Sequence, residues 1–234
     1  MAYPITLGTL VTRAQQRGND PSGEQLAVPE MKEIVSEHYG EIHAAVNDVG
    51  ARYHETEATI TATGAASYAL PTDHLSTIGI DFLVDSAGRR RELLQLMVQE
   101  RSIFAGQTGE AHYFALAGAN IVLYRTPATG TYKHLYIPQP TDYSTSGDST
   151  SVDVINIHGL RYIVWGVASI LLYRAESEQQ RAMVERDRAL QKLVEWAIER
   201  AKGMPKRQII TDIRALGSTS NIHGAWNPAS WMWR

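Results

Sequence analysis

The sequence has 234 residues, of which 44% are hydrophobic and 20% are charged, and its formal net charge is −3. This composition is ordinary for a folded protein, and the chain is long enough to bury a core without cross-links. The lack of cysteine excludes disulfides, thiolate metal sites and thiol nucleophiles, and the slightly acidic charge argues against a dedicated nucleic-acid binder.

Two helices are expected before the first strands. Thr6 can cap a short helix over 6–17, because its hydroxyl can accept a free backbone N–H of the first turn. Pro29 is a residue type favoured in a first helical turn, and the apolar residues after it keep helical spacing. The second predicted helix therefore covers 29–50.

Residues 55–138 are expected to form strands, because β-branched and aromatic residues alternate there with turn residues. Glu55–Thr63 and Ser67–Leu70 are predicted to pair as a hairpin around Gly64-Ala65-Ala66. Tyr113–Pro138 is predicted to form a three-stranded meander. One face of such a sheet needs a cover, and we expect the flanking helices to supply it.

Two further helices are expected after the strands. Residues 156–174 are apolar around most of the helix circumference, which predicts the central helix of a core. Residues 178–202 combine an apolar stripe with charged positions, end at Gly203, and should lie antiparallel to the preceding helix. The predicted fold class is α+β: an antiparallel bundle of about four helices carrying a small antiparallel β-sheet, with an extended C-terminal tail.

The last residues, 204–234, differ in character from the domain predicted over 1–203. They begin weakly apolar, continue through a polar spacer and end with three of the five tryptophans. Tryptophan is costly to leave exposed and is enriched at interfaces, so we expect a docking tail; a frayed terminus is the alternative. The predicted docking residues are Ile209, Ile210, Ile213, Leu216, Trp226, Trp231 and Trp233.

The sequence offers weak matches to catalytic patterns. Gly147-Asp148-Ser149 superficially matches the nucleophile block of one esterase group, but its flanks are polar and the histidine partner motif is missing. Glu55 and Glu57 share a strand face and could imitate a glycosidase pair, although adjacent surface carboxylates are far commoner. We therefore expect no enzymatic activity and no catalytic residues.

His38, Glu41 and His43 are the residues most suggestive of a metal site. Their spacing turns His43 away from His38 on a helix, and the H-E-x-x-H zinc pattern is missing. A partly buried histidine on an amphipathic helix is the better interpretation. Neither a metal nor a cofactor is expected.

The order of these pieces resembles a known family. The hairpin ending in Tyr68-Ala69-Leu70-Pro71, the strand Ile78–Val84 and the stretch Tyr113–Pro138 are followed by the polar loop Gln139–Val152 and a helical hairpin. Together, over roughly Thr6 to Lys202, they resemble the head-to-tail adaptor proteins of tailed bacteriophages. This group includes tail tubular protein A of short-tailed phages.

The resemblance implies a structural virion protein at the head–tail junction, made in the host cytoplasm. Such proteins form a ring of about 12 copies, and a closed ring needs two unlike faces on each subunit. The implied partners are the portal protein, a tail nozzle or tail tube protein, and further copies of the chain itself. DNA passes through the ring without specific binding, and no membrane is involved.

Two basic clusters are candidate contacts with a neighbouring subunit. A solvated face is the plainer interpretation of such clusters, and passing DNA is another. A DNA conduit should not hold its cargo through phosphate contacts, so we expect these residues at subunit contacts or on the outside. They are Arg89, Arg90, Arg91, Lys206 and Arg207.

Two alternative functions remain open at this point. A different tail-ring component, such as a stopper or nozzle protein, would share the general architecture. A stopper should carry a plug loop, and only Gln139–Val152 fits that description. A cell-wall hydrolase is the less favoured alternative, because it needs a catalytic set that the sequence does not offer.

Overall fold

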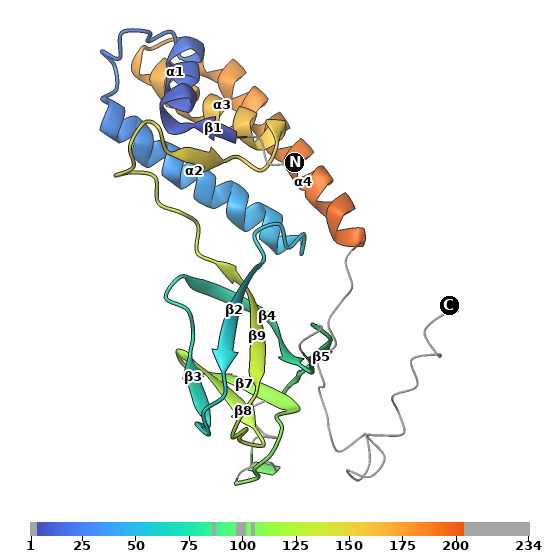
Figure 1. The fold of residues 1–234 in the computed structure, drawn as a ribbon. Helices are drawn as coiled ribbons and strands as arrows, with labels where there is room; N and C mark the ends of the chain where they lie inside the picture. The colour runs from blue at the N-terminus through green and yellow to red at the C-terminus, as the bar shows by residue number, and fades with distance from the viewer. Residues whose placement is uncertain (1–3, 86–87, 97–101, 104–105, 204–234) are drawn as a thin grey trace. The chain divides into compact units, whose positions relative to one another are not determined.

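The computed structural model of the chain describes residues 4–85, 88–96, 102–103 and 106–203. These residues form two compact units (Figure 1). The helical unit comprises 4–55 and 138–203, and the β unit comprises 56–137, so the β unit is inserted between two halves of the helical unit. None of the described helices is long and apolar enough to cross a membrane.

Within the described residues, the helical unit contains α1 Leu7–Arg17, α2 Val28–Asp48, α3 Ile157–Arg174 and α4 Gln179–Lys202. The Thr6 hydroxyl accepts the Thr9 N–H at the start of α1 (3.3 Å), and Pro29 lies in the first turn of α2. The side-chain oxygen of Asn156 caps α3 by accepting the Gly159 N–H (3.1 Å). Each helix begins and ends within two residues of its predicted range.

Helix α3 is the centre of the helical unit, because it packs against α1, α2 and α4. Two glycines allow this close packing. A Cβ at Gly166 would come within 2.3 Å of the His38 side chain on α2, and one at Gly18 within 2.6 Å of Leu171. Two short strands, β1 Pro4–Thr6 and β10 Ser151–Asp153, pair antiparallel in the same unit.

The β unit contains two four-stranded sheets with the strand orders β2-β9-β4-β5 and β3-β8-β7-β6. The pairings join segments far apart in sequence, such as β2 with β9 and β3 with β8. In chain order the strands are β2 Thr56–Thr61, β3 Ser67–Ala69, β4 His74–Leu83, β5 Arg90–Glu92, β6 Leu94–Gln95, β7 Tyr113–Ala117, β8 Asn120–Tyr124 and β9 Thr131–Pro138.

The two sheets of the β unit share one hydrophobic core. Ile80 and Tyr132 come from one sheet, Phe114 and Ile121 come from the other, and all four are almost fully buried. The Tyr132 hydroxyl accepts the backbone N–H of Ala111 at 3.2 Å, so its polar end is satisfied inside the core. Each sheet therefore covers the apolar face of the other.

The predicted strand pairings are wrong in two places. Ser67–Ala69 pairs with β8, with Tyr68 opposite Ile121, and not with the strand before Gly64. The predicted pairing of β7 with β8 is confirmed, but β9 leaves this sheet and pairs with β2 and β4. The reason is physical: a turn residue marks where a strand ends, but it does not say which distant edge the next strand will meet.

The predicted fold class is also wrong. The described residues contain ten strands in three sheets, so the fold is a mixed α+β arrangement rich in sheet and not a helical bundle with a small sheet. The strand pairs are not all antiparallel, because β6 and β7 run parallel. Helices were expected to cover the strands, whereas the core of the β unit consists of its own residues. The division into 1–203 and 204–234 stays a prediction, since 204–234 lie outside the described residues.

Candidate subunit and partner interface

The predicted docking tail cannot be placed on the structure. Ile209, Ile210, Ile213, Leu216, Trp226, Trp231 and Trp233 lie outside the described residues, as do Lys206 and Arg207. Their roles in docking and in subunit contact therefore stay predictions.

Arg89 directly precedes β5, and Arg90 and Arg91 are its first residues; each of the three has a carboxylate partner within the β unit. The ion pairs are Arg89–Asp85 (2.5 Å), Arg90–Glu57 (2.6 Å) and Arg91–Glu110. Arg91 also lies over the Phe82 ring, with its guanidinium carbon 5.3 Å from the ring centre. Arg89 has the most exposed side chain, at 80%. An intersubunit role for the three stays a prediction, and it would have to compete with these internal partners.

The polar loop between β9 and β10 is bound to the helical unit. Its backbone carbonyls accept the N–H groups of Leu7 and Gly8, both at 2.9 Å, and these are donors that a helix start leaves free. Lys32 of α2 lies 2.8 Å from the carboxylate of Asp148, and the Tyr143 side chain is buried in the helical core. These contacts do not favour a plug loop.

Two of the residues in the patterns that superficially suggested catalysis have structural partners. Asp148, the middle residue of Gly147-Asp148-Ser149, is paired with Lys32. Hydrogen bonds from Lys133 and Arg90 hold the pKa of Glu57 below its ordinary value. A glycosidase acid needs a raised pKa, so this environment is the wrong one for that role.

The candidate metal residues on α2 divide between two sets of contacts. The carboxylate of Glu41 accepts the Tyr162 hydroxyl at 2.6 Å and lies 2.7 Å from the His38 ring nitrogen. Burial acts to raise the pKa of Glu41, but these hydrogen bonds lower it below its usual range. His43 instead stacks on His54, with ring centres 4.2 Å apart. Among the described residues, no group of three His, Asp or Glu is placed to hold a metal ion.

Burial strongly lowers the pKa of one histidine in each unit. Burial lowers the pKa of His54 to about 4 in the helical unit. It does the same for His134 in the β unit, which is fully buried and stacks against both His74 and Tyr136. His134 is fully buried, whereas His54 is partly buried, and neither lines a groove described below.

A basic groove runs between α1 and α3. It has a volume of about 340 Å³, and its lining combines arginines with an apolar floor. The Arg17 guanidinium lies over the Trp165 ring, 5.1 Å from its centre, and Ile157 is 38% exposed at one end. We use the name basic groove for its lining residues Arg13, Gln16, Arg17, Ile157, Leu160, Arg161, Val164 and Trp165.

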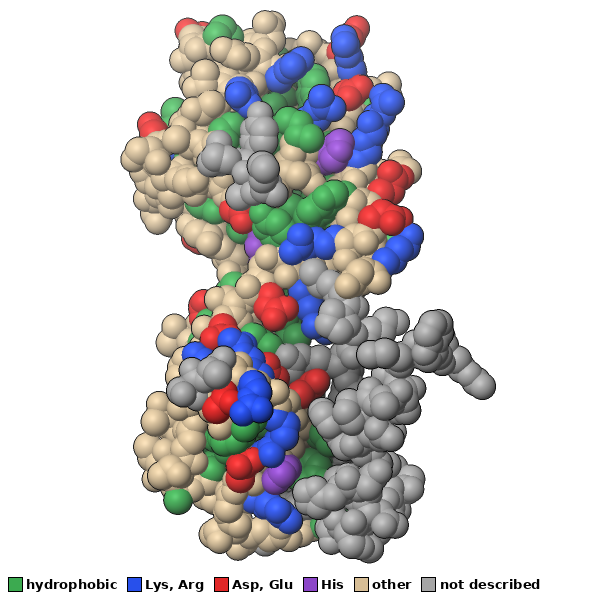
Figure 2. All heavy atoms as spheres, turned by 45° about the vertical axis from the view of Figure 1, so that its right-hand side comes forward, with side chains coloured by type: hydrophobic (Ala, Val, Ile, Leu, Met, Phe, Trp, Pro, Cys, Tyr) green, Lys and Arg blue, Asp and Glu red, His purple; other side chains and the backbone are tan. Residues whose placement is uncertain are grey.

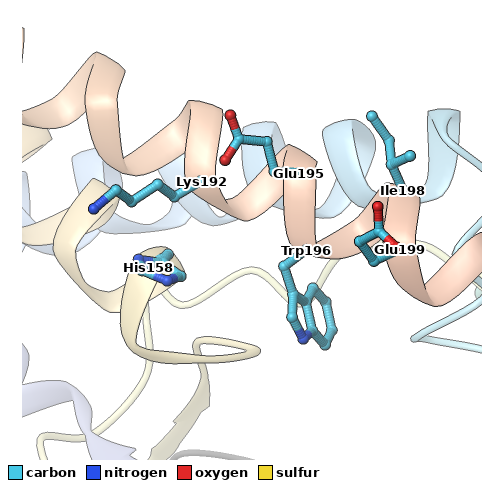
Figure 3. A pocket seen from close by; sticks show the side chains of 6 residues that line it. All are labelled: His158, Lys192, Glu195, Trp196, Ile198 and Glu199. Carbon is cyan, nitrogen blue, oxygen red and sulfur yellow. The ribbon is translucent and has the colours of Figure 1, made fainter.

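A second, more open groove lies between the start of α3 and the last turns of α4, with a volume of about 710 Å³. Figure 3 shows Lys192 extending from α4 toward His158 of α3, with Trp196 projecting from the same helix as Lys192. Burial lowers the pKa of His158, and the positive charges of Lys192 and Arg161 lower it further. Arg161 itself lines the basic groove.

The sequence interpretation missed the basic groove. Its residues come from helices far apart in the chain, so only the fold brings Arg13 and Arg17 next to Arg161 and Trp165. A partial signal was present. Arg13 and Arg17 are one helical turn apart, and Arg161 and Trp165 have the same spacing on a largely apolar helix. Figure 2 shows Lys and Arg side chains gathered on the forward face of the helical unit.

These features define a class of protein: two compact units whose described surface offers open grooves and charged faces that suit contacts with other proteins. The model of the SU10 adaptor protein family matches residues 5–210, and the chain belongs to this family. It is therefore a structural head-to-tail adaptor of a phage virion, in a family that is not one of enzymes. A comparison with curated proteins finds no match.

Proposed function

We propose that copies of this chain form a closed ring of about 12 subunits at the head–tail junction, between the portal and the tail nozzle or tail tube. The observation that supports this most strongly is the family match over 5–210, which spans both units. The ring would continue the DNA channel from the head without gripping the DNA. The sequence motifs around Tyr68–Pro71 and Tyr113–Pro138 suggest tail tubular protein A of short-tailed phages as the nearest type of adaptor. The chain would await assembly in the host cytoplasm.

The domain over 1–203 would build the ring, and the tail 204–234 would dock onto the portal. The three tryptophans Trp226, Trp231 and Trp233 would act as anchors, because large aromatic side chains dominate the binding energy of many interfaces. The isoleucines at 209, 210 and 213 and Leu216 would add a second apolar contact.

The test compares the full chain with a chain lacking 217–234, each alone and mixed with the portal, by mass measurement in solution. The full chain is expected to form a ring-sized assembly on the portal. The shortened chain is expected to keep its circular dichroism spectrum and to lose portal binding. Normal docking of the shortened chain would remove the tail from the proposal. A full chain that binds no portal and stays monomeric would overturn the ring.

A further inference from the structure

We propose that the basic groove receives the outer face of α2 from a neighbouring copy of the same chain, which makes this contact the repeating charge-complementary joint of the ring. The inference rests on the proposed ring and deepens it by naming the two faces. The groove belongs to α1 and α3, and the inserted face belongs to α2, so one copy can use both at the same time. A head-to-tail contact that closes into a ring requires this property.

The positive charges of the groove are not paired with carboxylates of the described residues. Arg13, Arg17 and Arg161 are exposed, and none of them forms an ion pair with a carboxylate among the residues that the structure describes. Arg89, Arg90 and Arg91 of the β unit differ in this respect, because each is already paired with a carboxylate. The buried Leu160 and the half-buried Trp165 give the groove an apolar floor, which suits a protein surface better than a phosphate chain.

The outer face of α2 has the complementary charge. Glu33, Glu37 and Asp48 are exposed on the side of α2 opposite the buried Val35 and Ile42, and helical spacing places them in one stripe. None of the three forms an ion pair within the described part of the chain. We call Glu33, Glu37, Gly40, Ala44 and Asp48 the acidic stripe.

Small residues let another surface approach the acidic stripe. Apart from the chain neighbours of Gly40 and the backbone of its own helix, no atom lies within 4 Å of the position that a Cβ would occupy there, and Ala44 is exposed beside it. Glu41, the next carboxylate along, is already held by Tyr162 and His38. The unpaired carboxylates therefore lie at the two ends of the stripe. The small side chains between them leave room for the indole of Trp165 from the neighbouring copy.

The spacing of the two faces also agrees. Glu33 and Glu37 are four residues apart on α2, as are Arg13 and Arg17 on α1, so each pair repeats at about 6 Å along its helix. Two helices laid side by side can then form two ion pairs in register. The partner is a second copy and not DNA, because the stripe supplies the carboxylates that the groove lacks.

Charge reversal tests the joint on the full chain. The stripe variant is Glu33→Arg with Glu37→Arg, and the groove variant is Arg13→Glu with Arg17→Glu. Each alone is expected to weaken ring assembly on the portal at least about tenfold, because like charges then meet at every joint. An equal mixture of the two variants is expected to restore assembly, since opposite charges face each other at every joint of an alternating ring.

Restored assembly in the mixture cannot come from a general folding defect, so it supports the joint even if each variant is less stable. Unchanged rings from both single variants would overturn the inference while leaving the proposed function intact. Loss of assembly with no recovery in the mixture would also overturn it. If the groove variant still assembles normally but loses affinity for duplex DNA, and the stripe variant is unaffected, the groove is a DNA contact and the inference fails.

A cross-link gives a second measurement, because the chain has no cysteine of its own. Arg17→Cys together with Glu37→Cys is expected to produce disulfide-linked ladders of many chains under mild oxidation on the portal. The control pair is Met183→Cys together with Glu37→Cys. Met183 lies on α4 and is exposed, but it does not line the groove. Equal ladders from both pairs would show random collision and contradict the proposed joint.

Discussion

The two units bury their apolar residues in different ways. In the helical unit, α3 is enclosed by three other helices, and each helix satisfies its own backbone hydrogen bonds before it packs. In the β unit, two sheets share a core, and strands such as β2 and β9 obtain their hydrogen bonds from partners far along the chain. The helices therefore need neighbours only to bury their apolar faces. The strands of the β unit also need the shared core to hold segments that are distant in sequence in register.

Removal of a core side chain from the β unit should have the largest effect. Phe114→Ala empties a site that is 2% exposed, so we expect the β unit to lose about 3–5 kcal/mol of stability. Hydrogen exchange should rise steeply in peptides from 56–137 and much less in peptides from α3. The control is Leu75→Ala, since Leu75 is 51% exposed and its removal leaves no cavity. Equal loss of protection in both units would show that they unfold as one body.

Acid should destabilise both units through different histidines. Burial lowers the pKa of His54 and of His134 to about 4, from an ordinary value of 6.5. Between those values the unfolded chain binds protons that the folded chain does not, so stability is present above about pH 6.5 and falls as pH drops toward 4. The loss should reach about 3 kcal/mol for each unit.

The measurement is unit-resolved hydrogen exchange over this pH range. His134→Gln should flatten the pH dependence of the β unit, where His74, Thr77 and Tyr136 contact the ring. The matched variant His54→Gln should flatten that of the helical unit alone. If either variant changed the pH dependence of both units equally, the two histidines would not act on the stability of separate units.

Alanine in place of two glycines of the helical unit should change the free energy of unfolding in opposite directions. These are the smallest of the expected effects. Gly159→Ala should cost about 1–3 kcal/mol, because the new Cβ would lie 2.2 Å from the carbonyl oxygen of Val154. Gly40→Ala should add about 0.5–1 kcal/mol, because alanine favours a helix and the space beside Gly40 is open. Denaturant unfolding of the two variants checks the signs. A gain at both positions would mean that local helix propensity alone decides stability there.

The same difference explains what could be predicted from the sequence. Helix ends were predicted to within two residues because Thr6, Pro29 and the apolar spacing are local signals. The partner of Ser67–Ala69 could not be predicted, because the edge of β8 is brought there only by the folded chain. The predicted fold class was wrong because strands were paired with their neighbours in sequence. A single small sheet built in this way would need helices to bury its apolar face.

The candidate interface follows the same rule. The tryptophan-rich end could be named from composition alone, because its residues are adjacent in sequence. The basic groove could not, since Arg17 and Trp165 meet only when α1 packs on α3. The arginines at 89–91 were visible as a run, but their carboxylate partners were not.

The pairing of β2 with β9 has a consequence for how this chain can change over time. The strand that enters the β unit and the strand that leaves it are immediate neighbours, with Thr56 opposite Tyr136. The points where the chain enters and leaves the inserted β unit are therefore only about 5 Å apart. Residues can be gained or lost within the β unit without moving the points where the chain enters and leaves it, so the two units can change in sequence and length independently of each other.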